Sequence, residues 1–317
     1  MERFWDETLN IVIREALGPA VPIINRFTHL GDGPVLIAMG VWIYWFGGAD
    51  SRRERAFVIA VGIAAFALSV GIKGVIALDR PDLAFAPADY PGYTFPSAHA
   101  LGAAAFYGAL AVTIQRRSPW LRYGLAGLAI GIVALSRVTL GVHYIGDVVI
   151  GSILGLALVW IGLRWRRGGE FRPGVVFVFA TVIAIITVAL GSRQFVSLVF
   201  GAGAGGAIGW VWVKDRPITE SGAAILVTGF VAFLGLAGVA AIPLFVGVPF
   251  PGVLDPVIFI AETVAYLLIV AFVMALPAIA VTVEDHPRVR WLQRVLPFRR
   301  RRVEFDSVDT EGPYTDD

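Results

Sequence analysis

Residues 56–78 read AFVIAVGIAAFALSVGIKGVIAL, a run in which Lys73 is the only charged side chain. A helix needs about 20 apolar residues to cross the hydrocarbon core of a bilayer. The run does not alternate between apolar and polar positions, so it favours a helix over a strand. Only helices and closed barrels satisfy their backbone hydrogen bonds in hydrocarbon. This stretch therefore predicts a transmembrane helix.

Eight further apolar segments surround it, near 31–48, 97–115, 121–140, 143–163, 172–191, 195–213, 221–242 and 256–283. We therefore expect an all-α, polytopic transmembrane helical bundle of about nine spans. Hydrophobic residues make up 57% of the chain and charged residues 16%, against roughly 45–50% and 25% in soluble domains. This balance excludes an ordinary cytosolic enzyme, a disordered protein and a protein that binds nucleic acid through a broad basic surface. The absence of cysteine excludes disulfides and thiol catalysis.

Basic residues cluster after the first, third, fifth, seventh and ninth spans, at 52–55, 116–122, 164–172, 214–216 and 288–302. Cytoplasmic loops are enriched in arginine and lysine. We therefore expect a cell-membrane protein in which these ends face the cytoplasm and the loop at 79–96 faces outward.

Four regions follow from this pattern. They are an N-terminal amphipathic helix lying in the membrane interface (1–30), a transmembrane core that holds every polar motif below (31–170), four additional transmembrane helices of undefined role (171–283) and a cytoplasmic tail that is first basic and then acidic (284–317).

The first polar motif runs from Lys73 to Pro81. Ionisable residues inside spanning segments are costly and point to function. Lys73 and Arg80 are seven residues apart, about two helical turns, so we expect them on one helix face that ends at Pro81. In the alternative interpretation, Lys73 reaches toward the interface and Arg80 is an ordinary flanking base.

The second motif is Pro96-Ser97-Ala98-His99. It predicts a helix that starts with Ser97 as its N-cap and carries His99 in its first turn. The free N–H groups of such a helix end favour a bound anion. Alternatively, Ser97 is only a cap and His99 an interfacial histidine.

The third motif holds Ser136, Arg137, His143 and Asp147. His143 and Asp147 are four residues apart, which predicts one helix face. A carboxylate that accepts from one imidazole nitrogen leaves the other free as a base or nucleophile. Gly141 predicts a turn that brings Arg137 and His143 together. The alternative is a purely structural histidine–carboxylate pair.

Together the motifs place cations, a helix N-terminus and two histidines at one depth of the membrane. This set suits a phosphate group, which needs charged donors, a nucleophile and an acid. The carboxylates are too few to hold Mg²⁺, so we expect no metal and no cofactor.

The three motifs resemble the signature of the type 2 phosphatidic acid phosphatase superfamily, which reads Lys-x6-Arg-Pro, Pro-Ser-Gly-His and Ser-Arg-x5-His-x3-Asp. The resemblance covers roughly residues 30–165 and departs from the signature at Ala98, where glycine is usual. It implies a metal-independent mechanism in which His143 attacks phosphorus and becomes a phosphohistidine. Asp147 would orient His143, and His99 would protonate the leaving group. The phosphoryl oxygens would be held by Lys73, Arg80, Ser97, the Ala98 backbone N–H and Arg137.

The resemblance implies an outward-facing, integral-membrane lipid phosphate phosphatase. The candidate substrate classes under this resemblance are polyprenyl diphosphates, phosphatidic acid and phosphatidylglycerophosphate-type lipids. One alternative is a lipid phosphotransferase on the same site. Another is a transporter or binding protein that holds a lipid phosphate without turnover.

We also expect membrane lipids as partners, and we expect no binding of nucleic acid. Gly201, Gly205 and Gly209 share one helix face that permits close helix contact, within the chain or between copies in an oligomer. Glu262 lies inside an apolar segment, and the sequence does not say whether it pairs with a neighbouring helix or lines a path.

Overall fold

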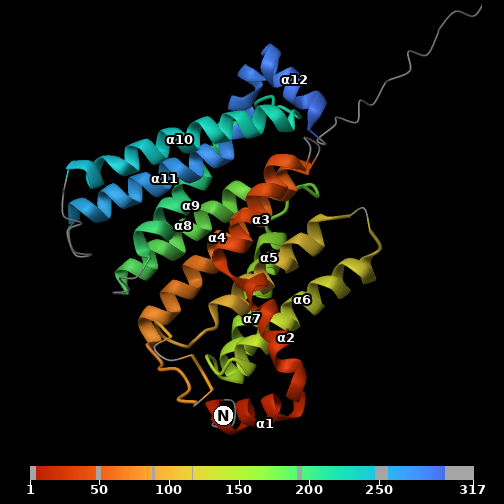
Figure 1. Ribbon diagram of the computed structural model, residues 1–317, viewed down its shortest axis with the longest axis vertical. Coiled ribbons are helices and arrows are strands. Elements are labelled where there is room, and N and C mark those ends of the chain that lie inside the picture. The colour runs from red at the N-terminus through yellow and green to blue at the C-terminus, as the bar shows by residue number, and fades with distance from the viewer. Residues whose placement is uncertain are drawn as a thin grey trace, which may run out of the picture.

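The computed structural model describes residues 5–47, 51–83, 85–87, 90–115, 117–190, 195–246 and 256–296. Every regular element within these ranges is helical, which confirms the all-α prediction (Figure 1). The α-helices are α1 (Glu7–Leu17), α2 (Val21–Arg26), α3 (Gly33–Phe46), α4 (Arg52–Ile76), α5 (Ala98–Thr113), α6 (Pro119–Thr139), α7 (Ile145–Arg164), α8 (Pro173–Ala189), α9 (Val196–Val213), α10 (Gly222–Val246), α11 (Pro256–Ile279) and α12 (Pro287–Val295).

Each of the nine expected apolar segments contains one helix, from α3 to α11. Among the described residues, five helices are long and apolar enough to cross a bilayer, namely α4, α6, α7, α9 and α11. Helices α3, α5, α8 and the described part of α10 are apolar but shorter. The chain is therefore a multi-pass membrane protein, while nine spans and their orientation stay predictions.

Helix α4 joins the two halves of the bundle, because it packs against α5 on one side and against α8 and α9 on the other (Figure 1). Its contact faces are rich in small residues, and Ala56, Ala60 and Ala64 are fully buried. Small side chains let neighbouring helices approach closely. The second half of the chain is thus built directly onto the helix that carries Lys73.

The glycine face of α9 packs against α11 of the same chain. A Cβ on Gly209 would lie 2.8 Å from the Ala271 carbonyl oxygen, and one on Gly201 would lie 2.8 Å from the Tyr266 Cβ. The expected close helix contact is confirmed. Within the chain α11 covers this face, and oligomer formation through it stays a prediction.

We expect Gly209→Ala to lower the stability of the protein by about 1–3 kcal/mol, because the added methyl group would force α9 and α11 apart. Gly127→Ala on α6 is the matched control, since its methyl group meets nothing within 4 Å. Alanine is the better helix former by about 1 kcal/mol, so this control should be neutral or stabilising. Thermal unfolding in detergent measures the stability of both variants. An equal change in the two melting temperatures would contradict the close packing of α9 against α11.

The predicted basic ends of three helices meet at one end of the bundle. Arg52 donates to the carbonyls of Val213 at 3.1 Å and Lys214 at 2.7 Å, and Arg53 pairs with Glu170 at 2.6 Å. Their clustering is consistent with the predicted topology.

Near the first residues of α9 and α11, the Ser197 hydroxyl donates to Glu262 at 2.7 Å. Glu262 therefore pairs with neighbouring helix α9.

The end of α4 and the structure of the tail differ from expectation. Helix α4 ends at Ile76, where Ala77 adopts a left-handed conformation with φ +48°, so Lys73 and Arg80 do not share a helix face and Pro81 does not end the helix. The predicted tail begins with α12, which packs against α10 at the opposite end of the molecule from α1 (Figure 1). The acidic part of the tail, 303–317, lies outside the described residues.

Candidate active site

His143 lies in the turn that connects α6 to α7. Gly141 has φ +73°, a conformation that glycine adopts without steric cost, and α7 begins at Ile145. The predicted turn is confirmed. The prediction that His143 and Asp147 share a helix face is wrong, since only Asp147 is on the helix. The turn nonetheless brings His143 Nδ1 to 3.4 Å from Asp147 Oδ2.

Thr94 joins the imidazole to the carboxylate. Its Oγ1 lies 3.0 Å from His143 Nδ1 and donates to Asp147 Oδ2. Since the Thr94 proton points to the carboxylate, its oxygen accepts the proton of Nδ1. On the opposite side of the ring, Nε2 lies 3.3 Å from Arg80 Nη1. A guanidinium has donors only, so Nε2 carries the free lone pair that a nucleophile requires.

The surroundings keep His143 neutral. Its side chain is only 3% exposed. Burial lowers the pKa of His143 well below its ordinary value, and the positive charges of Arg80, Arg137 and Lys73 lower it further. Both effects favour the neutral imidazole at neutral pH.

Two arginines meet on the ring of Tyr90. The Arg80 and Arg137 guanidinium carbons lie 4.6 Å and 5.3 Å from the ring centroid, and Arg137 Nη2 donates to the tyrosine hydroxyl at 2.8 Å. Burial lowers the pKa of Arg80 to about 10, so it remains charged at neutral pH. The Nε of Arg137 is buried and has no hydrogen-bond partner among the described residues. An unpaired buried donor is costly and calls for a ligand.

The loop before α5 closes the site. Lys73 Nζ donates to the carbonyls of Tyr93 and, at 3.1 Å, of Thr94. As predicted, Ser97 is the N-cap of α5, which begins at Ala98. The Ser97 backbone N–H donates to the Asp147 carbonyl at 3.1 Å, so the free N-terminus of α5 lies beside the His143–Asp147 pair.

His99 occupies the first turn of α5, as predicted, and its Nε2 lies 2.7 Å from Asp32 Oδ1. Asp32 and Thr94 were not predicted. An aspartate before an apolar segment and a threonine in a loop are common, so their sequence context does not distinguish them. Only their position in the fold reveals their contacts.

Helix α1 also reaches the site. The side chain of Asn10 is fully buried and donates to the carbonyls of Val138 at 3.0 Å and His143 at 2.9 Å. Trp5 Nε1 donates to Asp147 Oδ1 at 3.3 Å. The predicted helix is present over Glu7–Leu17 but does not continue to residue 30, because the chain turns at Gly18 (φ +44°) and α2 follows as a separate short helix. Residues of α1 and the segment before it brace the turn that carries His143, a role the amphipathic pattern did not reveal. The location of α1 in the membrane interface stays a prediction.

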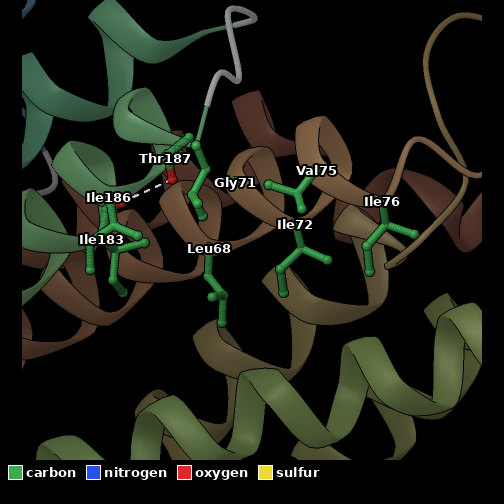
Figure 2. Close-up of a pocket in the computed structure, with 9 residues that line it drawn as sticks. Leu68, Gly71, Ile72, Val75, Ile76, Ile183, Ile186 and Thr187 are labelled. Carbon is green, nitrogen blue, oxygen red and sulfur yellow. Dashed lines mark hydrogen bonds between the residues drawn. The ribbon is translucent and has the colours of Figure 1, made fainter.

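One hollow lies at the site, and another lies along α4, the helix that carries Lys73. One of about 260 Å³ is partly lined by Arg80, Tyr90 and Val142. The other is an apolar groove of about 280 Å³ between α4 and α8, shown in Figure 2. Its walls include Leu68, Ile72 and Ile76 from α4, Ile183 and Ile186 from α8, and Leu190 directly after α8. The groove and Lys73 thus share helix α4.

We expect Thr94→Val to reduce kcat by about 10- to 100-fold, because removing one partner of a buried hydrogen bond costs about 1–3 kcal/mol. The matched control is Thr113→Val, whose buried hydroxyl bonds to the carbonyls of Ala109 at 2.9 Å and Leu110 at 3.1 Å, both in its own helix. Steady-state phosphate release measures both variants. Unchanged turnover in Thr94→Val would show that the hydroxyl does not orient His143.

Comparison with known proteins places these motifs in a family. Residues 54–170 match the model of the PAP2 superfamily. The chain is 29% identical over 150 residues to phosphatidylglycerophosphatase B of Bacillus subtilis, covering 44% of this chain and 71% of that protein. It is 37% identical over 110 residues to decaprenylphosphoryl-5-phosphoribose phosphatase of Mycobacterium tuberculosis, covering 33% of this chain and 58% of that protein.

The crystal structure of a transmembrane PAP2-type phosphatidylglycerolphosphate phosphatase from Bacillus subtilis is 26% identical, with a TM-score of 0.42, and the match covers 51% of this chain and 88% of that one. The family match includes Lys73, Arg80, His99, His143 and Asp147 and stops before α8. Residues 54–170 therefore carry the PAP2 superfamily pattern, and the relatives that share it are named as phosphatases.

Proposed function

We propose that this chain removes phosphate from a membrane lipid through a phosphohistidine formed on His143, without a metal ion. The observation that carries the proposal is the state of the His143 ring, whose Nδ1 bonds to Thr94 and whose Nε2 faces Arg80 at 3.3 Å. A neutral imidazole in this tautomer directs its lone pair at the place where cations gather. That arrangement suits attack on a phosphoryl group.

In the proposed reaction, Nε2 of His143 forms a bond to phosphorus while the bond to the leaving oxygen breaks. His99 gives its proton to that oxygen, and Arg80, Arg137 and Lys73 stabilise the negative charge that develops. Water then attacks the phosphohistidine, gives a proton to His99 and releases inorganic phosphate. Asp147 holds the imidazole through Thr94 in both steps.

A lipid substrate suits the apolar groove along α4, the helix that also carries Lys73. Among the described residues that line the groove, only Thr187 has a side-chain polar atom, and its hydroxyl donates to the Ile183 carbonyl at 2.9 Å. The groove therefore offers a surface for hydrocarbon rather than for a sugar or nucleotide. The relatives are named for phosphatidylglycerophosphate and a decaprenyl lipid, so we include both lipid classes, with phosphatidic acid, among the substrates to be tested.

The test is phosphate release by purified protein from a panel of these lipids, with and without a chelator. We expect release from at least one lipid at the same rate in the chelator. Loss of activity in the chelator that added metal restores would overturn the metal-independent mechanism. Phosphate that appears only after an acceptor alcohol is supplied, as a transfer product, would identify a phosphotransferase instead. Lipid binding without turnover would identify a binding protein.

A further inference from the structure

A row of three side chains runs from the site to the surface. His99 Nε2 lies 2.7 Å from one oxygen of Asp32, and His29 Nδ1 lies 2.7 Å from the other. The exposed fractions of the side chains rise along the row, from 19% for His99 to 30% for Asp32 and 73% for His29. Among the described residues, no group of three histidine or acidic side chains is arranged to hold a metal ion.

The ordinary role of Asp32 would be to cap α3, and its carboxylate does not do so. Asp32 occupies the N-cap position of α3 but makes no side-chain hydrogen bond to the helix. Aspartate at this position normally accepts from a backbone N–H of the first turn. Both carboxylate oxygens instead bind imidazoles, and Asp32 lies outside the part of the chain that matches the family model, 54–170.

The charge state of Asp32 defines the tautomer of His99. Partial burial acts to raise the pKa of Asp32, but hydrogen bonds and charge interactions with His29 and His99 outweigh it and hold the pKa below its ordinary value. An ionised carboxylate only accepts hydrogen bonds. Nε2 of His99 therefore carries a proton toward Asp32, which leaves Nδ1 as the nitrogen available to exchange a proton in the reaction.

We propose that Asp32 is a positioning residue that holds His99 as the general acid and base, and that His29 links this pair to solvent. The proposal rests on the function proposed above. When the bond from phosphorus to the leaving oxygen breaks, the Nδ1 proton of His99 moves to that oxygen. When water attacks the phosphohistidine, its proton returns to Nδ1. Asp32 stays ionised throughout and stabilises the imidazolium, which burial and then the positive charges of Arg137 and Arg80 disfavour.

The test compares leaving groups that differ in their need for a proton. The substrates are the best lipid phosphate from the panel and nitrophenyl phosphate, whose leaving group departs without protonation. For Asp32→Asn we expect kcat/KM for the lipid phosphate to fall by about 100-fold, at the lower end of what general acid catalysis contributes. We expect kcat/KM for nitrophenyl phosphate to fall less than about 3-fold. The matched control is Asp79→Asn, another carboxylate in the same region, which is exposed.

A double-mutant cycle with His99→Ala separates this role from a fold defect. If Asp32 acts through His99, Asp32→Asn has no further effect once His99 is alanine. His29→Gln should reduce turnover only slightly, because the exposed end of the row exchanges protons directly with water. Equal losses on the two substrates, or additive losses in the cycle, would overturn the proposal. Wild-type protein that released phosphate from no lipid would instead refute the proposed function.

Discussion

Replacing His143 with alanine is expected to reduce phosphate release by about 10⁴-fold or more, the scale seen when a nucleophile is removed from an enzyme that forms a covalent intermediate. The ring is buried, its Nδ1 lies 3.0 Å from Thr94 Oγ1, and its Nε2 lies 3.3 Å from Arg80 Nη1. The described structure offers no second imidazole in this position. Initial rates with the best lipid phosphate, measured on purified protein, test this expectation.

The matched control is His286→Ala. His286 caps α12 by accepting from the Arg288 backbone N–H at 3.3 Å, far from the site. Its loss should leave turnover unchanged. The pKa of His143 is lowered, so its reactive neutral form persists as the pH falls. In the pH–rate profile of the wild-type protein, we therefore expect the fall in activity on the acid side to lie below about pH 6.5, the ordinary pKa of an imidazole. More than one per cent residual activity in His143→Ala would exclude it as the nucleophile.

The second large effect is expected for Arg137→Lys, with a fall in kcat/KM of about 10²- to 10³-fold. Lysine keeps the charge but loses the planar set of donors. Arg137 is 2% exposed, donates to Thr28 and Tyr90 at 2.8 Å each, and keeps its Nε unpaired among the described residues. That nitrogen is the free donor that we assign to a phosphoryl oxygen.

Vanadate supplies an independent measurement for the same variant, because it imitates the trigonal-bipyramidal state of phosphoryl transfer. If Arg137 recognises this state, its replacement should weaken vanadate inhibition by the same factor by which it lowers kcat/KM. The control is Arg122→Lys on the same helix, where the guanidinium donates to the Ile114 carbonyl at 3.1 Å. Unchanged vanadate inhibition in Arg137→Lys would remove this residue from the phosphate site.

The sequence predicted the helical class and the convergence of distant motifs because both depend on local patterns. Apolar runs at 56–78 and elsewhere have the length and composition of spanning helices. The sequence pattern predicted Ser97 as the N-cap of a helix, and the structure confirms it as the N-cap of α5. The turn at Gly141 follows from the conformational freedom of glycine. These features require no knowledge of which helices become neighbours.

The remaining features depend on tertiary contacts. Helix α4 ends at Ile76 through a left-handed alanine, for which the sequence carries no usual signal. Thr94, Asn10 and Asp32 become recognisable only when the fold brings them to His143 and His99, across as many as 133 positions in the sequence. The glycine face at 201–209 has the same pattern whether its partner is α11 or a second copy of the chain.

The most direct test of the account is to find where phosphate is covalently bound during turnover. His99→Ala, supplied with nitrophenyl phosphate, should still accept the phosphoryl group but lose its base for the water step, so the intermediate should accumulate. Rapid quenching in alkali, which preserves phosphohistidine, followed by peptide mass spectrometry locates the modification. The account predicts phosphate on His143. Phosphate on another residue, or release of nitrophenol with none detected on His143, would contradict it.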